Sequence, residues 1–148
     1  MIIPLTFIPE DKLFIFRCLV RISHFHEAFG NVRFIYDTGS SGSFISQEDA
    51  DRIRVPINSL ERDKEQIGRG LAGGAILLYK LPEITLSFID PKTQQIQRIQ
   101  CKNFHVGKCA SNKPEMRLKD SIIGNSFLIE HKLRLVANPH SDSYLESI

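Results

Sequence analysis

Residues 34–45 read Phe-Ile-Tyr-Asp-Thr-Gly-Ser-Ser-Gly-Ser-Phe-Ile, and the rest of the chain is best interpreted from this stretch. An apolar run with strand character ends at Asp37, a turn rich in glycine and serine follows, and the chain then becomes apolar again. Because apolar residues enclose Asp37 on both sides in the sequence, we expect its carboxylate to be partly buried. A buried carboxylate is costly unless it accepts hydrogen bonds or keeps its proton. Thr38, Ser40 and the backbone near Gly39 are available as donors, so the pattern predicts a carboxylate placed for chemistry.

Composition limits the classes of protein to which the chain can belong. Its 148 residues suffice for one domain with a substantial core, and 42% hydrophobic with 24% charged residues is typical of globular proteins. The formal net charge is +2, and Lys and Arg are scattered along the sequence, so we expect no nucleic-acid partner. The three cysteines lack metal-ligand spacing, and neither a signal peptide nor a membrane span is recognisable. We therefore expect a cytoplasmic protein with no membrane partner, no metal and no cofactor.

Strand patterns dominate the chain. Apolar residues alternate over 12–22, and a second strand over 31–36 follows a polar loop. Ser46 is a good N-cap for a short helix over 47–52. Further short strands are expected over 76–79, 84–89, 97–101, 104–106, 121–124 and 133–137, with a second short helix over 125–132 and an exposed connection over 58–66. The pattern predicts a mainly β fold, a closed antiparallel β-barrel with one or two short helices.

The domain organisation follows from the same pass along the chain. We expect a single domain over residues 1–139. Residues 140–148 are polar and are expected to form a C-terminal tail, because the ends of domains are often poorly ordered.

Three other chemistries fit the sequence less well. Residues 68–73 match the dinucleotide pattern G-x-G-x-x-G, but the β-rich residues 75–88 follow where a helix is needed, so a glycine-rich hairpin over a cleft is favoured. Residues 39–43 do not complete the nucleophile elbow G-x-S-x-G of serine hydrolases. His24 and His26 have no further ligand cluster nearby in the sequence, which favours a solvated loop over a metal site.

The stretch from residue 34 to 45 resembles the active-site segment of retropepsin-like aspartic proteases, the retroviral-protease type. In that family an apolar strand leads into Asp-Thr-Gly followed by Ser or Ala. Here the glycine-rich residues 68–74 take the place of the family's flap. Ile122-Ile123-Gly124 resembles its second signature, which packs beneath the catalytic turn. Residues 127–128 and 133–136 follow as its short helix and last strand do, so the resemblance extends over residues 12–138.

The resemblance implies an aspartic endopeptidase in which Asp37 is the catalytic acid and base. Thr38 is expected to hydrogen-bond across a two-fold axis, Gly39 to permit close backbone approach, and Ser40 to support the turn. The implied flap and substrate-binding residues are Gly68, Arg69, Gly70, Leu71, Ala72, Gly73 and Gly74. The implied floor beneath the turn consists of Ile122, Ile123 and Gly124.

The chain contains a single Asp-Thr-Gly. Enzymes of this class activate a water with two carboxylates that share one proton, because like charges so close together cannot both ionise. We therefore expect a homodimer in which Asp37 meets its symmetry mate, with a polypeptide substrate bound as an added strand. A catalytically silent dimerisation or peptide-binding module on the same fold is the main alternative, and a monomeric β-barrel binding protein is another. In the family the last strands build the dimer interface, whereas this chain continues past Pro139. The sequence therefore leaves open which strands form the dimer interface.

Overall fold

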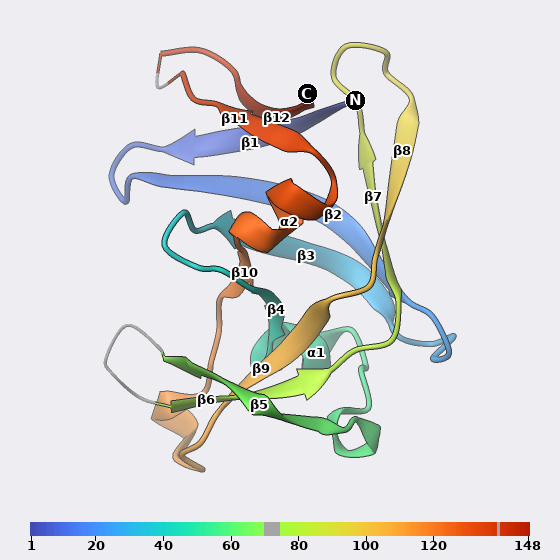
Figure 1. Cartoon of the computed structure of the whole chain (residues 1–148), viewed down its shortest axis with the longest axis vertical. Coiled ribbons are helices and arrows are strands. Elements are labelled where there is room, and N and C mark those ends of the chain that lie inside the picture. Colours follow the sequence, from blue (N-terminus) through green and yellow to red (C-terminus); the bar gives the residue numbers. More distant parts are fainter. Residues whose placement is uncertain (70–74, 139) are drawn as a thin grey trace.

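The computed structural model describes residues 1–69, 75–138 and 140–148, with the backbone alone for residues 65–69. The fold is mainly β with two short helices, as expected (Figure 1). The strands are β1 (Ile2–Ile8), β2 (Leu13–Ile22), β3 (Phe29–Tyr36), β4 (Ser43–Ser46), β5 (Arg62–Arg69), β6 (Ala75–Lys80), β7 (Ile84–Ile89), β8 (Ile96–Cys101), β9 (Phe104–Cys109), β10 (Ser121–Ile123), β11 (Leu133–Val136) and β12 (Ser143–Ser147). The helices are α1 (Gln47–Arg52) and α2 (Asn125–Glu130), and single 3-10 turns lie at Ile57–Ser59 and Pro114–Met116.

Strand pairing runs in the order β11-β12-β1-β2-β3-β10-β4-β9-β6-β5, and the β7–β8 hairpin branches from β2. Among the described strands this path keeps two free ends, so the expected closed barrel is not confirmed. The sheet is also not wholly antiparallel, because β10 lies parallel to β3 and β4 lies parallel to β9. Both parallel pairs join strands far apart in the sequence, where no hairpin turn imposes an antiparallel direction.

The β2–β3 hairpin forms as the alternation of apolar residues predicted. Its register runs from Phe14 opposite Tyr36 to Arg21 opposite Phe29. Alternate residues of β2, Phe16 among them, point into the core and are almost fully buried. The core continues from β3 through edge-on aromatic contacts, from Phe34 to Phe104 at 5.9 Å and from Phe104 to Phe127 of α2 at 6.2 Å between ring centroids. These contacts hold α2 against the strand that leads to Asp37.

Two polar segments form strands that the sequence did not predict. The polar residues 140–148 were expected to form a tail, but β12 pairs with both β1 and β11. Ser143 and Leu145 are buried at 3% and 1% exposure, so alternate side chains of this short strand face inward. Likewise, residues 58–66 were expected to form an exposed connection, but β5 begins at Arg62 and Asp63 is buried. In both segments polar composition concealed the strand, because pairing outweighed local propensity: β12 pairs with the distant β1, and β5 pairs with β6, the next strand along the chain.

None of the helices within the described ranges combines the length and apolar character that crossing a membrane requires.

Candidate active site

The Asp-Thr-Gly turn connects β3 to β4 and passes over the end of β10, which lies between them. The turn leaves β3 after Tyr36 and returns to the sheet at Ser43 in β4, and β10 lies between these two strands. Ile123 of β10 is in register with Tyr36, and its carbonyl accepts the Asp37 N–H at 3.0 Å. The strands before and after the turn are therefore held by the same short strand, which fixes where the turn begins and ends.

Asp37 is exposed in the single chain, contrary to the expectation of partial burial. The apolar residues before it, Phe34 and Tyr36, face the core, whereas the turn projects beyond the end of the sheet. The Gly39 N–H donates to Asp37 Oδ1 at 2.9 Å, and the Ser40 N–H donates to the Asp37 carbonyl at 3.1 Å. The carboxylate is thus oriented by its own turn and open to solvent.

The first turn of α2 holds the other side of the Asp-Thr-Gly turn. The Asn125 N–H donates to the Ser40 carbonyl at 2.8 Å, and the Ser126 N–H donates to the Ser41 carbonyl at 2.9 Å. The Asn125 side chain donates through Nδ2 to the Thr38 carbonyl at 2.7 Å. The first N–H groups of a helix lack partners within the helix, and here the turn supplies them.

Tyr36 holds the Asn125 side chain through a hydrogen bond. Its hydroxyl donates to Asn125 Oδ1 at 3.3 Å, and burial raises the pKa of this hydroxyl above its ordinary value. The hydroxyl therefore stays protonated and serves as a donor. Sequence reasoning missed Asn125, and the available signal was its position directly after Ile122-Ile123-Gly124.

Gly124 lies against the backbone of the turn. A Cβ at this position would sit 2.3 Å from the Gly42 carbonyl oxygen and 2.6 Å from the Ser40 carbonyl oxygen. The Gly124 N–H donates to Ser43 Oγ at 3.0 Å, and Ser43 is buried. The structure therefore brings Ile122-Ile123-Gly124 beside the turn, at a separation that leaves no room for a side chain.

A buried polar layer joins β10 to α1. Ser46 caps α1 as expected, because its Oγ accepts the Asp49 N–H at 3.1 Å. Ser121 Oγ donates to Asp49 Oδ2 at 2.6 Å and accepts the Ser46 N–H at 2.9 Å. This network ties the far end of β4 to β10, so both strands that flank the turn are anchored.

Comparison with solved structures finds a match over almost the whole chain. A crystal structure of a retropepsin-like aspartic protease from Rickettsia conorii aligns with a TM-score of 0.52 and 16% identity, covering 98% of this chain and 88% of that one. The fold is that of a retropepsin-like aspartic protease. The retroviral protease-like domain of Ddi1 from Leishmania major also aligns, at 14% identity over 88% of this chain and 92% of that one, with a TM-score of 0.40. No family model matches the chain, and no curated protein matches it. At this level of identity the likeness concerns the fold.

In this retropepsin-like fold the glycine-rich residues 68–74 begin within the end of β5. Gly68 and Arg69 end β5 and pair with Ile76 and Ala75 of β6. The remaining predicted flap residues, Gly70, Leu71, Ala72, Gly73 and Gly74, lie outside the described residues. The base of the β5–β6 hairpin is tied to β9, because His105 Nε2 lies 2.9 Å from Asp63 Oδ2.

The candidate histidines of the sequence lie away from this site, whereas Ser40 lies within its turn. His24 and His26 are exposed in the β2–β3 connection. Within the part of the chain that the structure describes, no three His, Cys, Asp or Glu side chains come together as metal ligands. The Ser40 hydroxyl donates to the Gly42 carbonyl at 2.8 Å and so belongs to the turn itself.

Proposed function

We propose that the chain is an aspartic endopeptidase that works as a homodimer, with one Asp37 from each copy in a shared active site. The observation that carries this proposal is the exposure and hydrogen bonding of the Asp37 carboxylate. Its Oδ1 accepts the Gly39 N–H, and its Oδ2 accepts no hydrogen bond from the described residues. A carboxylate that is exposed but fixed by a bonded turn is suited to share a proton with a second carboxylate. The retropepsin-like fold supports the same conclusion.

The proposed reaction needs both carboxylates in different protonation states. The ionised Asp37 takes a proton from a water, whose oxygen attacks the carbonyl carbon of the peptide bond. The protonated Asp37 of the other copy donates to the carbonyl oxygen. The Asp37 that took the proton from water then gives it to the amide nitrogen, one hydroxyl of the tetrahedral intermediate returns its proton to the other Asp37, and the C–N bond breaks. The pair is left with one proton, as it began.

The Thr38 hydroxyl supports a second copy beside the turn. Thr38 is exposed, and none of the described residues forms a hydrogen bond with its hydroxyl. We assign it to a bond across the two-fold axis, where it locks the two turns together. The β5–β6 hairpin, with residues 68–74, is assigned to cover an extended peptide.

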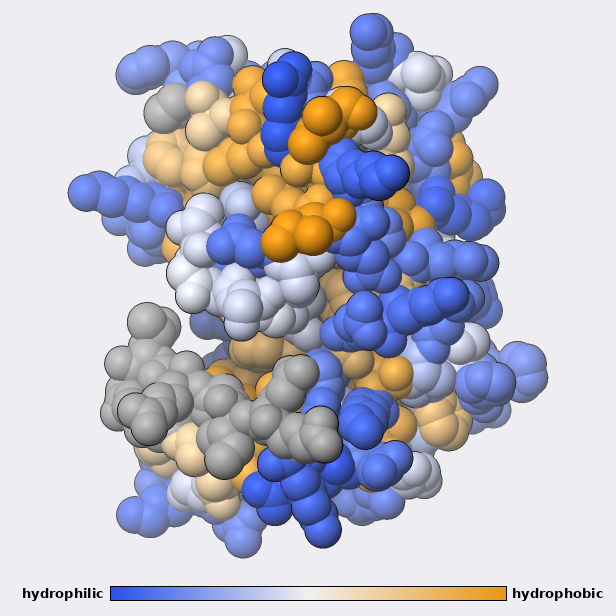
Figure 2. Space-filling model, viewed as in Figure 1, coloured by the Kyte–Doolittle hydropathy of each residue, from blue (hydrophilic) through white to orange (hydrophobic). Residues whose placement is uncertain are grey.

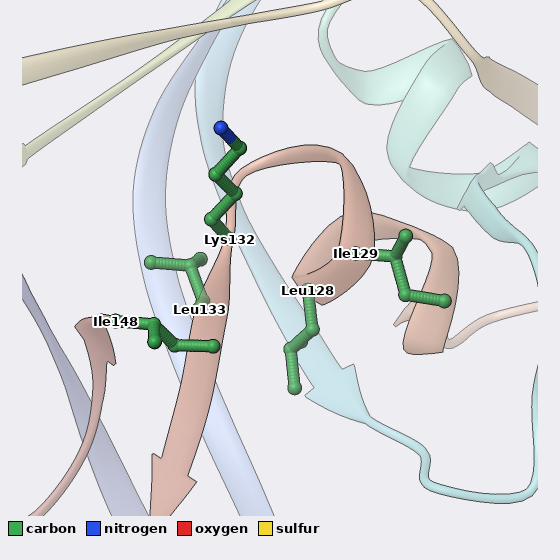
Figure 3. A pocket seen from close by; sticks show the side chains of 5 residues that line it. All are labelled: Leu128, Ile129, Lys132, Leu133 and Ile148. Atoms are coloured by element: carbon green, nitrogen blue, oxygen red, sulfur yellow. The ribbon is translucent and has the colours of Figure 1, made fainter.

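An apolar surface next to the turn supports a dimer through α2. Figure 2 shows hydrophobic residues gathered over α2 and the neighbouring terminal strands. A hollow of about 360 Å³ lies on this surface. In Figure 3 the Leu128 side chain points between α2 and β11. Leu133 and Ile148 lie on one side of it, and Ile129 lies on the other. Ile129 is 78% exposed and Ile148 is 84% exposed. Exposed apolar patches of this kind mark interfaces between proteins.

β11 adds a free backbone edge to the same surface. It ends the strand order beside β12, so one of its edges has no partner among the described strands. A free edge is a ready template for pairing with another chain. Because α2 both holds the Asp-Thr-Gly turn and carries Ile129, we place the dimer interface on α2 and β11. The two turns then approach each other as the surfaces meet.

Ile129→Lys is expected to weaken the dimer without harming the fold of the single chain, in which Ile129 is 78% exposed. Full burial of an isoleucine contributes about 1.5–3 kcal/mol, and the dimer loses this contribution twice. The dimer dissociation constant should therefore rise by roughly 10²-fold or more, measured by sedimentation equilibrium. Ile96→Lys is the matched control, because Ile96 is 59% exposed on β8. Equal dissociation constants for the two variants would place the interface elsewhere.

Titration with a statin-type inhibitor tests the function directly. Such compounds mimic the tetrahedral intermediate and bind between two carboxylates. We expect one inhibitor bound for about two chains, at a mass that light scattering assigns to the dimer. One inhibitor per chain, or binding to a monomer, would refute the shared site. Dimers that hold inhibitor and peptide but never hydrolyse the peptide would indicate the silent binding module instead.

A further inference from the structure

Arginine residues that are scattered in the sequence gather on one face of the folded sheet. Strands β3, β2, β7 and β8 lie side by side in this order (Figure 1). Alternate residues of paired strands share a face. Arg17 of β2 lies opposite Arg33 of β3. Ser87 of β7 lies between Leu19 of β2 and Arg98 of β8, so Arg98 is on the same face as Leu19 and Arg17. Arg21, two residues after Leu19 on β2, is on this outer face too, which therefore carries four exposed arginines. We call it the arginine face.

The charges of the arginine face are not neutralised within the fold. Arg17 and Arg33 are direct cross-strand neighbours, an arrangement of like charges that destabilises a sheet. Arg17 donates to Thr6 Oγ1 at 3.2 Å, which supplies no negative charge. Among the described residues, no carboxylate forms an ion pair with any of the four arginines. The fold alone therefore does not explain why they stand together.

A groove of about 530 Å³ runs along this face beside α1. Three guanidinium side chains line it, those of Arg17, Arg33 and Arg52. Asp49 also lines the groove, but its carboxylate is paired with Arg52 at 2.9 Å. The groove thus offers donors for more than one acidic group, while its floor is the paired backbone of β2 and β3.

We propose that the arginine face binds an extended acidic segment of a partner polypeptide, a role beyond the proposed hydrolysis. The planar guanidinium matches a carboxylate with two parallel hydrogen bonds. Ile89 and Ile96 lie opposite each other at one end of the face, 56% and 59% exposed. Aliphatic side chains between the acidic residues of the partner can pack there.

Two features favour a polypeptide over a nucleic acid. The net charge of +2 provides no long-range attraction for a phosphate backbone. Proteins that bind single strands stack bases on exposed aromatic rings, whereas on this face the Arg21 guanidinium lies over the Phe29 ring, 5.0 Å from its centroid. The face therefore supplies guanidinium groups that donate to carboxylates, together with aliphatic contacts, and its Phe29 ring, 49% exposed, already carries the Arg21 guanidinium on one side.

Binding of a defined peptide tests the proposal. The probe is a fluorescent peptide of alternating glutamate and leucine, with a glutamine-for-glutamate version as its control. Fluorescence anisotropy is measured with the full chain carrying Asp37→Asn, so that hydrolysis of the probe does not disturb the reading. Arg17→Gln with Arg33→Gln should weaken binding by roughly tenfold or more, and added salt should weaken it further. Lys12→Gln with Lys113→Gln removes the same charge from exposed positions off this face and should leave binding unchanged.

The outcomes separate this proposal from folding defects and from other partners. Because Arg17 and Arg33 repel each other, their replacement should not lower the thermal midpoint. Equal affinity of the two double variants for the acidic peptide would overturn the proposal, as would equal affinity of the parent chain for the glutamine peptide. Tighter binding of a single-stranded oligonucleotide, or of phosphatidylserine vesicles, would assign the face to a different partner. None of these results depends on whether the chain hydrolyses peptides.

Discussion

Asp37→Asn is expected to abolish peptide hydrolysis while leaving the fold intact. An asparagine keeps an oxygen that can accept the Gly39 N–H but neither takes up nor gives a proton in the reaction. The loss of acid and base catalysis should lower kcat by roughly 10³-fold or more. Because Asp37 is exposed in the single chain, the thermal midpoint should change little. Activity is measured on a quenched fluorescent peptide, beside the control Asp120→Asn at another exposed carboxylate.

Mixing the two proteins tests whether the site needs both copies. In an equal mixture that exchanges freely, about half of the dimers carry one Asp37 and one asparagine. If both carboxylates are required, the activity per wild-type chain falls to about one half of its value in the unmixed protein. Undiminished activity in the mixture would mean that a single Asp37 suffices, and the proposed mechanism would then be wrong.

Gly124→Ala should be the most damaging change of a single methyl group. The new Cβ would lie 2.3 Å and 2.6 Å from two backbone carbonyl oxygens of the turn, which are not free to rotate away. The φ of Gly124 is −103°, so an alanine suits the local backbone and the clash alone carries the effect. Overpacking of this kind costs about 3 kcal/mol, equivalent to a thermal midpoint lower by roughly 10 °C. A turn displaced by about 1 Å should also lose on the order of 10²-fold in kcat.

Gly42→Ala is the matched control for stability, because it lies in the same turn. No atom lies within 4 Å of a Cβ built on Gly42. Its replacement should therefore change the free energy of unfolding by about 0.5 kcal/mol or less. Both variants are compared at one protomer concentration, since dimerisation adds stability that depends on concentration. If the two variants prove equally stable, the backbone of the turn must yield to a side chain at residue 124, and the tight packing inferred here would be wrong.

Local patterns in the sequence predicted several elements correctly. The alternation over residues 12–22 and 31–36 predicted the β2–β3 hairpin, and Ser46 predicted the start of α1. These features depend on neighbours in the sequence, so residue types and spacing suffice to predict them. Asp37 was singled out by its apolar neighbours and Gly124 by the resemblance to retropepsin-like proteases, and the fold brings their segments together.

Other features depended on which distant strands pair. The polar composition of residues 140–148 predicted a tail, but β1 and β11 pair with β12 on both of its sides. The apolar neighbours of Asp37 predicted burial, but their side chains turn inward and the carboxylate points outward. Asn125 was missed because its role depends on the start of a helix meeting a turn that lies 87 residues earlier in the sequence.

By itself, the sequence determined a mainly β chain with one Asp-Thr-Gly turn and an Ile-Ile-Gly segment that resembles its usual companion. The tertiary structure alone decided that β10 lies between β3 and β4, that β12 joins the sheet, and that Arg17, Arg33 and Arg98 share one face. The physical reason is that periodicity tells which side chains of a strand point inward, whereas the neighbours of that strand are set by burial and backbone pairing across the whole chain.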